Sequence, residues 1–386
     1  MTSAVFPLHG ELPAARSRRF ARTVEFFLVG GVTPLLFPFA WLARRTFGAD
    51  PAELAVGFLA FHAAHVVNDP HFSVTYLLFY RKVRSRLSAA YWGAAQRARY
   101  VAAGFVVPVV LVSWAASALL ARSAVSLGWL IQVMFLLVGW HYVRQGFGVL
   151  SILSARHGAR LTALERRAYS THAFAAWAYA WASPADRGTE MEERGVVYTT
   201  LAHGPLLERV TFVVFVATAV AVAVVVLRRR LVAGRFPPFA PLAGYLSALW
   251  SWTVYSRVEP LVVYVIPALH SVQYLYLVGL STSAEQREVQ ERPFVSRTLR
   301  ARLGLLAVSA IALAWVLFHG APELLDAAWF PRRGRLFDGG NLGVAPCAAA
   351  FFVCVNIHHY FMDWVIWRRE NPDARLLPLS PEAGPG

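Results

Sequence analysis

The chain has 386 residues, of which 57% are hydrophobic, and its mean hydropathy is +0.47. This is more apolar than soluble globular proteins, whose apolar share is about half, so the composition indicates a polytopic membrane protein. The net charge of +15 would suggest a nucleic-acid partner in a soluble chain. Here the arginines lie between apolar runs, where they orient the protein and meet anionic headgroups, so we expect no nucleic-acid binding.

Three parts are expected: a leader over residues 1–23, a transmembrane helical domain over 24–367 and a tail over 368–386. The leader is basic but lacks the short apolar core and cleavage site of a signal peptide, so we expect it in the cytoplasm. The tail is proline-rich and predicts little regular structure. Cys347 and Cys354 are about two helical turns apart in one apolar run, which excludes a disulfide between them.

Crossing about 30 Å of hydrocarbon takes roughly 20 apolar residues, and runs of this kind predict an all-α helical bundle. The run 168–183 is short and rich in Trp and Tyr, so it predicts either a span or an interfacial helix, and the count is nine or ten. Pro70 is expected to break the second run, and 184–208 and 320–341 are polar insertions. The candidate spans are 24–43, 53–80, 100–121, 126–153, 168–183, 210–227, 239–256, 259–281, 303–319 and 342–367.

Arginine clusters fall on alternate connections between these runs, which predicts that both termini are cytoplasmic. Arg332, Arg333 and Arg335 oppose this pattern, since they fall on an outer connection. Lys82 is the only lysine, and such arginine usage is typical of a GC-rich bacterial coding sequence. We therefore expect an integral protein of the bacterial inner membrane.

The second run contains three histidines and an aspartate in otherwise apolar sequence. In a helix, His62, His65 and Asp69 fall at i, i+3 and i+7 and project from one face; His71 follows. An ionisable side chain in lipid costs a few kcal/mol unless it is paired or lines a cavity. This spacing therefore predicts a metal-ligand face.

A stretch near the C-terminus repeats the arrangement. Asn356, His359 and Asp363 are again spaced i, i+3, i+7, and His358 is adjacent. One isolated histidine in a span is more often satisfied by backbone or water than by a metal. Two such faces favour the metal interpretation.

The proposed topology gives the even-numbered spans a common direction, and four of them carry a histidine in the inner half. His71, His141, His270 and His359 fall roughly 13 to 22 Å from the cytoplasmic ends at about 1.5 Å per residue, so they can share one layer. Iron and zinc sites in helical bundles are built from His and carboxylates projecting inward from several helices. We therefore expect one buried site where spans 2, 4, 8 and 10 meet.

The remaining polar residues are divided between ligands, their supports and the surface. Ligating histidines usually donate their second N–H to a carboxylate, amide or carbonyl. His9, His157, His203 and His319 lie at ends or loops and are expected to be solvated. The candidate ligands are His62, His65, Asp69, His71, His141, His270, His358, His359 and Asp363, and the candidate supporting residues are Gln145, Gln273, Tyr274, Asn356 and His172.

The motifs resemble those of histidine-box membrane oxygenases. Pro70-His71-Phe72, Trp140-His141-Tyr142 and His270-Ser271-Val272-Gln273-Tyr274 follow, in order, the Pro-His-Gly, Trp-His-Phe-Gly and His-Ser-x-Arg-His of the bacterial retinal-forming carotene dioxygenases. The glycines are absent, and Tyr274 stands where that family has its last His. His358 and His359 can supply the missing ligands. His62-x-x-His65 and the pair His358-His359 also resemble the HxxxH and HxxHH boxes of the desaturase and hydroxylase superfamily. Either resemblance implies a non-haem iron oxygenase acting on a lipid.

The leading hypothesis is a membrane-embedded enzyme with non-haem iron, expected as two ions, that uses O₂ and an external electron donor on a lipid or isoprenoid chain. A zinc-dependent lipid hydrolase is the second possibility. Haem b held by paired histidines for electron transfer is the third. A metal or proton-coupled transporter is the fourth, although the sequence shows no inverted repeat and its polar residues gather at one depth.

Overall fold

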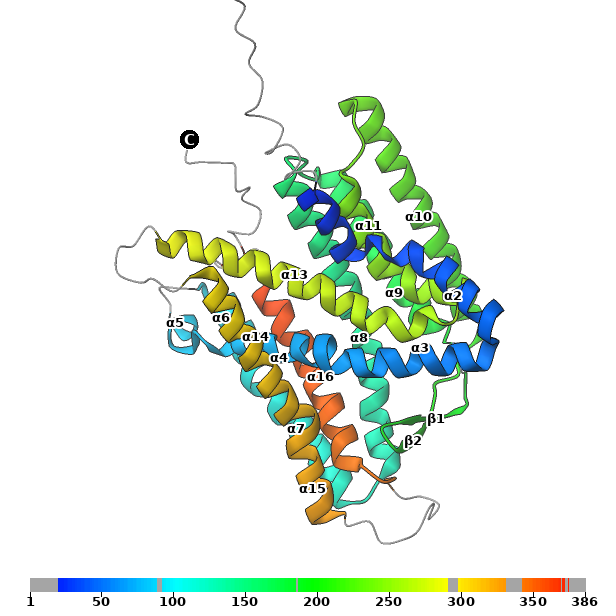
Figure 1. The fold of residues 1–386 in the computed structure, drawn as a ribbon, viewed down its shortest axis with the longest axis vertical. Coiled ribbons are helices and arrows are strands. Elements are labelled where there is room, and N and C mark those ends of the chain that lie inside the picture. The colour runs from blue at the N-terminus through cyan, green and yellow to red at the C-terminus, as the bar shows by residue number, and fades with distance from the viewer. Residues whose placement is uncertain are drawn as a thin grey trace, which may run out of the picture.

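A computed structural model describes residues 20–88, 92–184, 187–290, 298–330 and 342–368, together with 370, 371 and 374; side chains 286–290 are not described. Most of the leader with His9, the arginines at 332, 333 and 335, and most of the tail lie outside these residues. The described chain is almost entirely helical, which confirms the predicted all-α class. Figure 1 shows helices packed into one bundle with a single small hairpin.

The described bundle contains fifteen numbered α-helices, a helical segment over residues 20–26 and five π-helical turns. The π turns are η1 (Phe27–Gly31), η2 (Ala64–Asn68), η3 (Ala102–Val106), η4 (Ser251–Tyr255) and η5 (Val316–Gly320). The α-helices are α2 (Thr33–Phe47), α3 (Ala49–Ala63), α4 (Asp69–Tyr80), α5 (Val83–Leu87), α6 (Ala94–Val101), α7 (Val107–Leu120), α8 (Ala124–Arg156), α9 (Ala163–Ala182), α10 (Pro205–Ala233), α11 (Phe239–Trp250), α12 (Ser256–Val258), α13 (Val262–Gln290), α14 (Leu299–Trp315), α15 (Ala321–Trp329) and α16 (Pro346–Ile366).

Six helices within the described ranges are long and apolar enough to cross a membrane, so the protein is a membrane protein. They are Ala94–Leu120, Ala124–Arg156, Pro205–Ala233, Val262–Glu285, Leu299–Trp329 and Pro346–Ile366. Phe20–Gly31 and Thr33–Phe47 together make a seventh if this pair, bent by 63°, is one span. The predicted runs 53–80, 168–183 and 239–256 are also mostly helical but fall below that apolarity, because polar side chains interrupt them.

Proline explains three of the π turns. The residue before Pro70, Pro108 or Pro322 donates its N–H five residues back, to Ala64, Ala102 and Val316 respectively. Proline has no N–H and cannot continue the regular ladder, so the helix takes one wider turn in front of it. The expectation that Pro70 breaks the second span is therefore wrong, because α3, η2 and α4 form one continuous helical stretch.

A two-stranded hairpin occupies the insertion 184–208, which the sequence predicted only as polar. β1 (Glu190–Glu193) pairs antiparallel with β2 (Val196–Thr199) through the two-residue turn Arg194-Gly195. Both turn residues have positive φ, 49° and 88°, as a type I′ hairpin turn requires. Val196 is fully buried in the largest apolar cluster of the bundle, so the hairpin is packed onto the helices.

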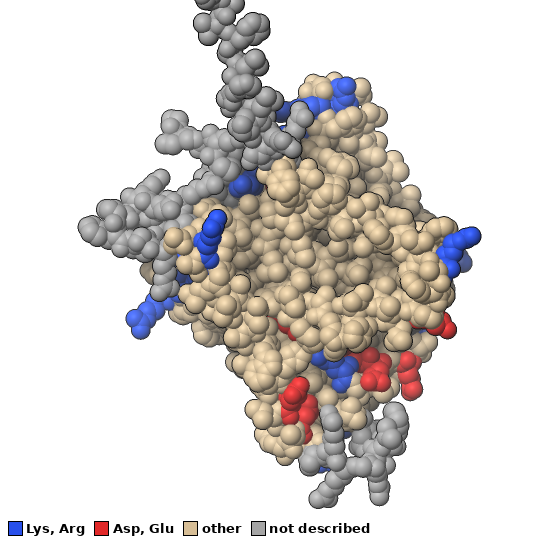
Figure 2. Space-filling view, in the orientation of Figure 1, with Lys and Arg blue, Asp and Glu red and all other residues tan. Residues whose placement is uncertain are grey.

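Charged side chains border the bundle on the face seen in Figure 2. Most Lys and Arg lie toward the top and the flanks, acidic residues with one basic patch among them lie in the lower half, and the broad middle carries almost no charge. Such a band suits the hydrocarbon layer.

Arg86, which the sequence placed among the loop arginines, is instead buried, at 1% exposure, and donates to the carbonyls of Leu78 and Phe79 at the end of α4. It satisfies backbone groups that the end of a helix leaves free.

We expect Gly343→Ala to destabilise the fold by more than about 1 kcal/mol. Gly343 has φ +74°, and a Cβ there would lie 1.7 Å from the carbonyl oxygen of Gly195 in the hairpin turn. Gly304→Ala is the control, because a Cβ at that position meets nothing within 4 Å. Thermal unfolding in detergent compares the two variants, and equal midpoints would contradict the tight docking of the hairpin.

Candidate metal centre

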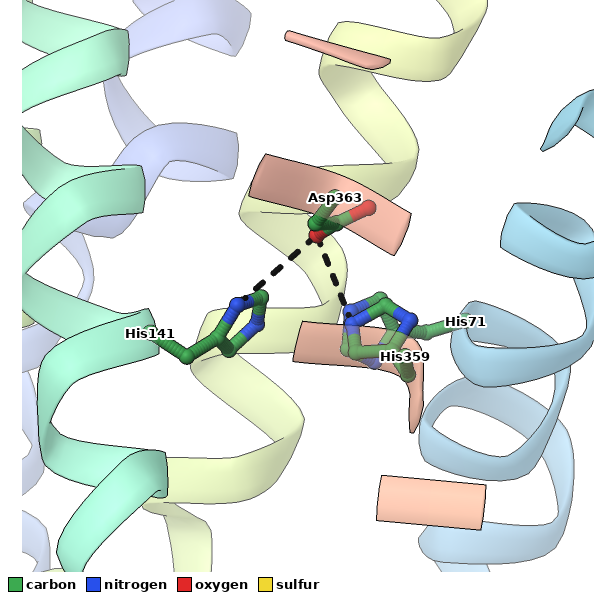
Figure 3. A group of neighbouring side chains, drawn as sticks. All are labelled: His71, His141, His359 and Asp363. Carbon is green, nitrogen blue, oxygen red and sulfur yellow. Dashed lines mark ion pairs between the residues drawn. The ribbon is translucent and has the colours of Figure 1, made fainter. Parts of the chain in front are cut away.

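Four helices bring histidines to one point inside the bundle. His71 comes from α4, His141 from α8, His270 from α13 and His359 from α16, which also supplies Asp363. None is more than 6% exposed. Figure 3 shows His71, His141 and His359 around the carboxylate of Asp363. The shared layer predicted for these helices is thus present as a compact cluster.

The side chains of this cluster are in direct contact. Ligand atoms of His71, His141, His359 and Asp363 all lie within 4.8 Å of one another. Asp363 Oδ2 is 3.4 Å from His359 Nε2 and 3.8 Å from His141 Nδ1. His270 joins the cluster through its Nε2, which is 2.9 Å from Nε2 of His141. We call these five residues the buried centre.

Helical spacing explains why α16 contributes two of the five. His359 and Asp363 are four residues apart, so they lie one above the other on the same helix face, and α16 is the most buried of the six spans, at 72%. His71 lies in the first turn of α4, just after the π turn and Pro70. The crossing of α4 and α13 beside α8 and α16 brings the other three rings to that face.

Hydroxyl groups hold two members of the buried centre in place. The Tyr274 hydroxyl donates to Asp363 Oδ1 at 2.8 Å and lies 2.6 Å from Thr75 Oγ1. Ser271 Oγ is 3.2 Å from His71 Nδ1. Tyr274 was expected as a supporting residue, whereas Thr75 and Ser271 were missed. Their positions gave a signal, since Thr75 is i+4 from His71 and Ser271 follows His270.

The glutamines expected to support histidine rings bind backbone carbonyls and each other instead. Gln145 donates to the carbonyl of His270 and to Oε1 of Gln273, both at 3.0 Å. Gln273 donates to the carbonyls of Val29 and Gly244. These bonds join η1, α8, α11 and α13 behind the buried centre. The predicted ring contact is therefore wrong for Gln145, because the amide finds a free carbonyl on the neighbouring helix.

Several imidazole nitrogens of the buried centre have no hydrogen-bond partner among the described residues. They are Nε2 of His71, Nδ1 of His270 and both ring nitrogens of His359, although His359 Nε2 lies within ion-pair distance of Asp363. A buried polar group without a partner is costly, about 1–3 kcal/mol. A neutral imidazole has one nitrogen with a lone pair, so these rings can offer a donor atom to a ligand.

Besides His65 and Asp69, four predicted residues lie outside the buried centre, each with partners of its own. His62 is exposed, with Nδ1 2.8 Å from the Phe58 carbonyl. His358 Nδ1 is 2.9 Å from the Tyr76 hydroxyl, and Asn356 bonds within α16. His172 lies between Thr218 and Trp250. The expectation that all of these belong to one centre is wrong, because neighbouring residues on a helix point in different directions.

A second group forms at the edge of the bundle from His65, Asp69 and His319. Asp69 Oδ2 is 3.3 Å from His65 Nδ1 and 3.4 Å from His319 Nε2. His319 was expected to be solvated, but its side chain is only 26% exposed. His157 was also expected in solvent and instead pairs with Glu25 at 2.5 Å. Both histidines are paired because the fold brings an acidic residue from a distant part of the chain next to each of them.

Comparison with protein-family models, with curated proteins and with solved structures finds no match for this chain. No family therefore stands behind the resemblance of its motifs to histidine-box oxygenases. The chemistry of the buried centre follows from its own residues: four imidazoles and one carboxylate, enclosed in an apolar bundle that spans a membrane.

Proposed function

We propose that the protein is a membrane-embedded oxidoreductase whose buried centre binds one non-haem iron ion. His71, His141, His359 and Asp363 are the ligands, and His270 supports His141 from its other ring nitrogen. The observation that carries the proposal is the convergence of four buried imidazoles, three of which have a ring nitrogen without a hydrogen-bond partner among the described residues. Neutral imidazole and carboxylate are the donor set that suits iron and zinc.

The spacing of the donor atoms fits this role. Metal bonds of about 2.0–2.2 Å place neighbouring ligand atoms roughly 3 to 3.5 Å apart. Asp363 Oδ2 is 3.4 Å from His359 Nε2 and 3.8 Å from His141 Nδ1, which is near this range. One carboxylate offsets part of the ion's charge, which favours a cation in a medium that otherwise excludes it.

Aromatic rings exclude water from the buried centre. Tyr142 stacks on His270 with ring centroids 3.8 Å apart, Tyr360 stacks on His141 at 4.7 Å, and Phe72 packs edge-on against His359 at 4.8 Å. When bound, iron would supply the activation of O₂. The rings would hold the imidazoles and keep the reaction dry, while Thr75 and Tyr274 orient Asp363 through its Oδ1.

An apolar substrate suits this enclosure. We propose a lipid or isoprenoid chain that enters from the bilayer, with O₂ as co-substrate. Hydroxylation or desaturation would take two electrons from an external donor, whereas cleavage of a carbon–carbon double bond would place both oxygen atoms in the products and need none. A small cavity against His270, lined by Gly30, Tyr142, Ser247 and Ser251 among others, is a candidate approach for O₂.

The alternatives fit less well. Histidine rings of the buried centre lie in contact, with centroids 4.5 to 5.1 Å apart for His71 with His359 and with His270, which leaves no room for a porphyrin between them. Zinc suits the same ligands, but hydrolysis needs water, and the surrounding rings are apolar. A transport path would need polar groups across the bilayer, whereas these gather in one cluster.

We also propose the finer topology, with ten spans, both termini in the cytoplasm and residence in the bacterial inner membrane. The basic ends of the helices support it. Reporter fusions after Lys82, Arg160, Arg230 and Arg302 are expected to lie in the cytoplasm, as measured by a compartment-sensitive reporter. A fusion after Leu120 is the matched control and should lie outside; the same side for all five would contradict this topology.

Replacement of a proposed ligand should remove the metal. We expect His141→Ala and His359→Ala to lose most of the iron bound by detergent-purified protein, because each removes one donor from a preorganised set. His203→Ala is the control, since His203 packs on Trp181 away from both histidine groups. Elemental analysis with optical and Mössbauer spectra measures this. Equal iron content in all four proteins would sink the assignment.

The support of Asp363 gives a separate test. Asp363→Asn keeps the shape of the side chain but removes its charge, and Tyr274→Phe removes the hydrogen bond to Oδ1 while keeping the ring. We expect each to lower iron affinity by about 10- to 100-fold, measured by competition with a chelator. Tyr276→Phe, which loses a bond to Glu25 instead, should leave the affinity unchanged. Normal affinity in both test variants would remove Asp363 from the ligand set.

A further inference from the structure

We infer that His65, Asp69 and His319 form a second binding site, for a divalent transition-metal ion, distinct from the buried centre. Two imidazoles and one carboxylate from two separate helical stretches meet there, with their ligand atoms within 4.8 Å of one another. Such a His₂-carboxylate set leaves coordination positions open and suits iron, zinc or cobalt.

The distances in this group fit a bound metal ion. Both histidines approach the same oxygen, Asp69 Oδ2, at 3.3 and 3.4 Å. Hydrogen bonds between charged groups are shorter, about 2.7–2.9 Å. Tetrahedral ligands at about 2.0–2.2 Å from an ion would lie roughly 3.4 Å apart, which agrees with the observed separations.

Both histidines lie in π turns, and this is an independent observation. His65 is in η2 and His319 is in η5, and η2 contacts α14, the helix that leads into η5. Single π turns inside α-helices are found frequently at functional sites. Pro70 and Pro322 account for the turns themselves, but not for a histidine on each of them facing one carboxylate.

The site is separated from the buried centre. Asp69 and His71 are two residues apart in α4, and side chains at i and i+2 do not face each other. Phe72 lies between the two groups, because its ring packs against Phe318 of η5 at 5.6 Å and against His359 at 4.8 Å. The two sites therefore share a helix but not a ligand.

The environment of the site is mixed in charge and in exposure. Asp69 is 3% exposed, whereas the side chains of His65 and His319 are 37% and 26% exposed, so an ion and its remaining water ligands can enter from the outer edge. Arg194 in the hairpin turn adds a positive charge that interacts electrostatically with Asp69.

Cobalt titration tests the second site. Purified full-length protein is stripped with a chelator and titrated with Co²⁺ alone, and bound equivalents are counted from the visible absorption and by elemental analysis. We expect two equivalents in the wild type and one in His319→Ala, with the remaining one lost in His141→Ala/His319→Ala. His203→Ala should bind two. Circular dichroism reports whether each variant is folded, and His65→Gln and Asp69→Asn replace His319→Ala if it is not.

The outcomes separate this site from the buried centre. One equivalent in the wild type that persists in His319→Ala, His65→Gln and Asp69→Asn would overturn the second site and leave the buried centre in place. One equivalent that disappears in those variants but persists in His141→Ala would support the second site and overturn the proposed function. No binding in the wild type would overturn both.

Discussion

The structure of the bundle depends on one constraint: imidazoles and a carboxylate that are buried inside a membrane must have polar partners within the protein. An aspartate at the centre of a transmembrane helix costs about 2.5–3.5 kcal/mol, and Asp363 is only 6% exposed among four histidines. Tyr274 and Thr75 satisfy one of its oxygens, while the other faces His141 and His359. That carboxylate is surrounded by hydroxyls, aromatic rings and crossing helices. Their arrangement provides it with polar partners in a region from which water is excluded.

The backbone meets the same requirement in a different way. In lipid every N–H and C=O has to be satisfied inside the protein, yet prolines interrupt several helices. The π turns before Pro70, Pro108 and Pro322 rebuild the ladder one residue wider, so the chain keeps its hydrogen bonds and gains a change of direction. Two of these turns carry His65 and His319. The positions at which the backbone deviates are thus also positions that carry polar side chains.

The sequence predicted much of the buried centre but not its borders. The position of a residue along its predicted span was enough to place five residues in one layer, because that position can be read from each helix separately. These residues are His71, His141, His270, His359 and Asp363. The same reasoning wrongly placed His62, His358, Asn356 and His172 with the buried centre. The direction in which a side chain points depends on which helices pack beside it. The partnership of His319 with Asp69 joins residues 250 positions apart. The hairpin was missed although Arg194-Gly195 between short runs is a turn signal.

The position of α16 has a consequence for biosynthesis. It is the most buried span and the last described helix, and it supplies two of the five residues of the buried centre. During translation the helices bearing His71, His141 and His270 enter the bilayer before it, with their polar side chains facing a gap. Until α16 inserts, those side chains have neither Asp363 nor His359 as neighbours. A chain that has not yet inserted α16 therefore lacks the carboxylate that faces these histidines in the folded protein.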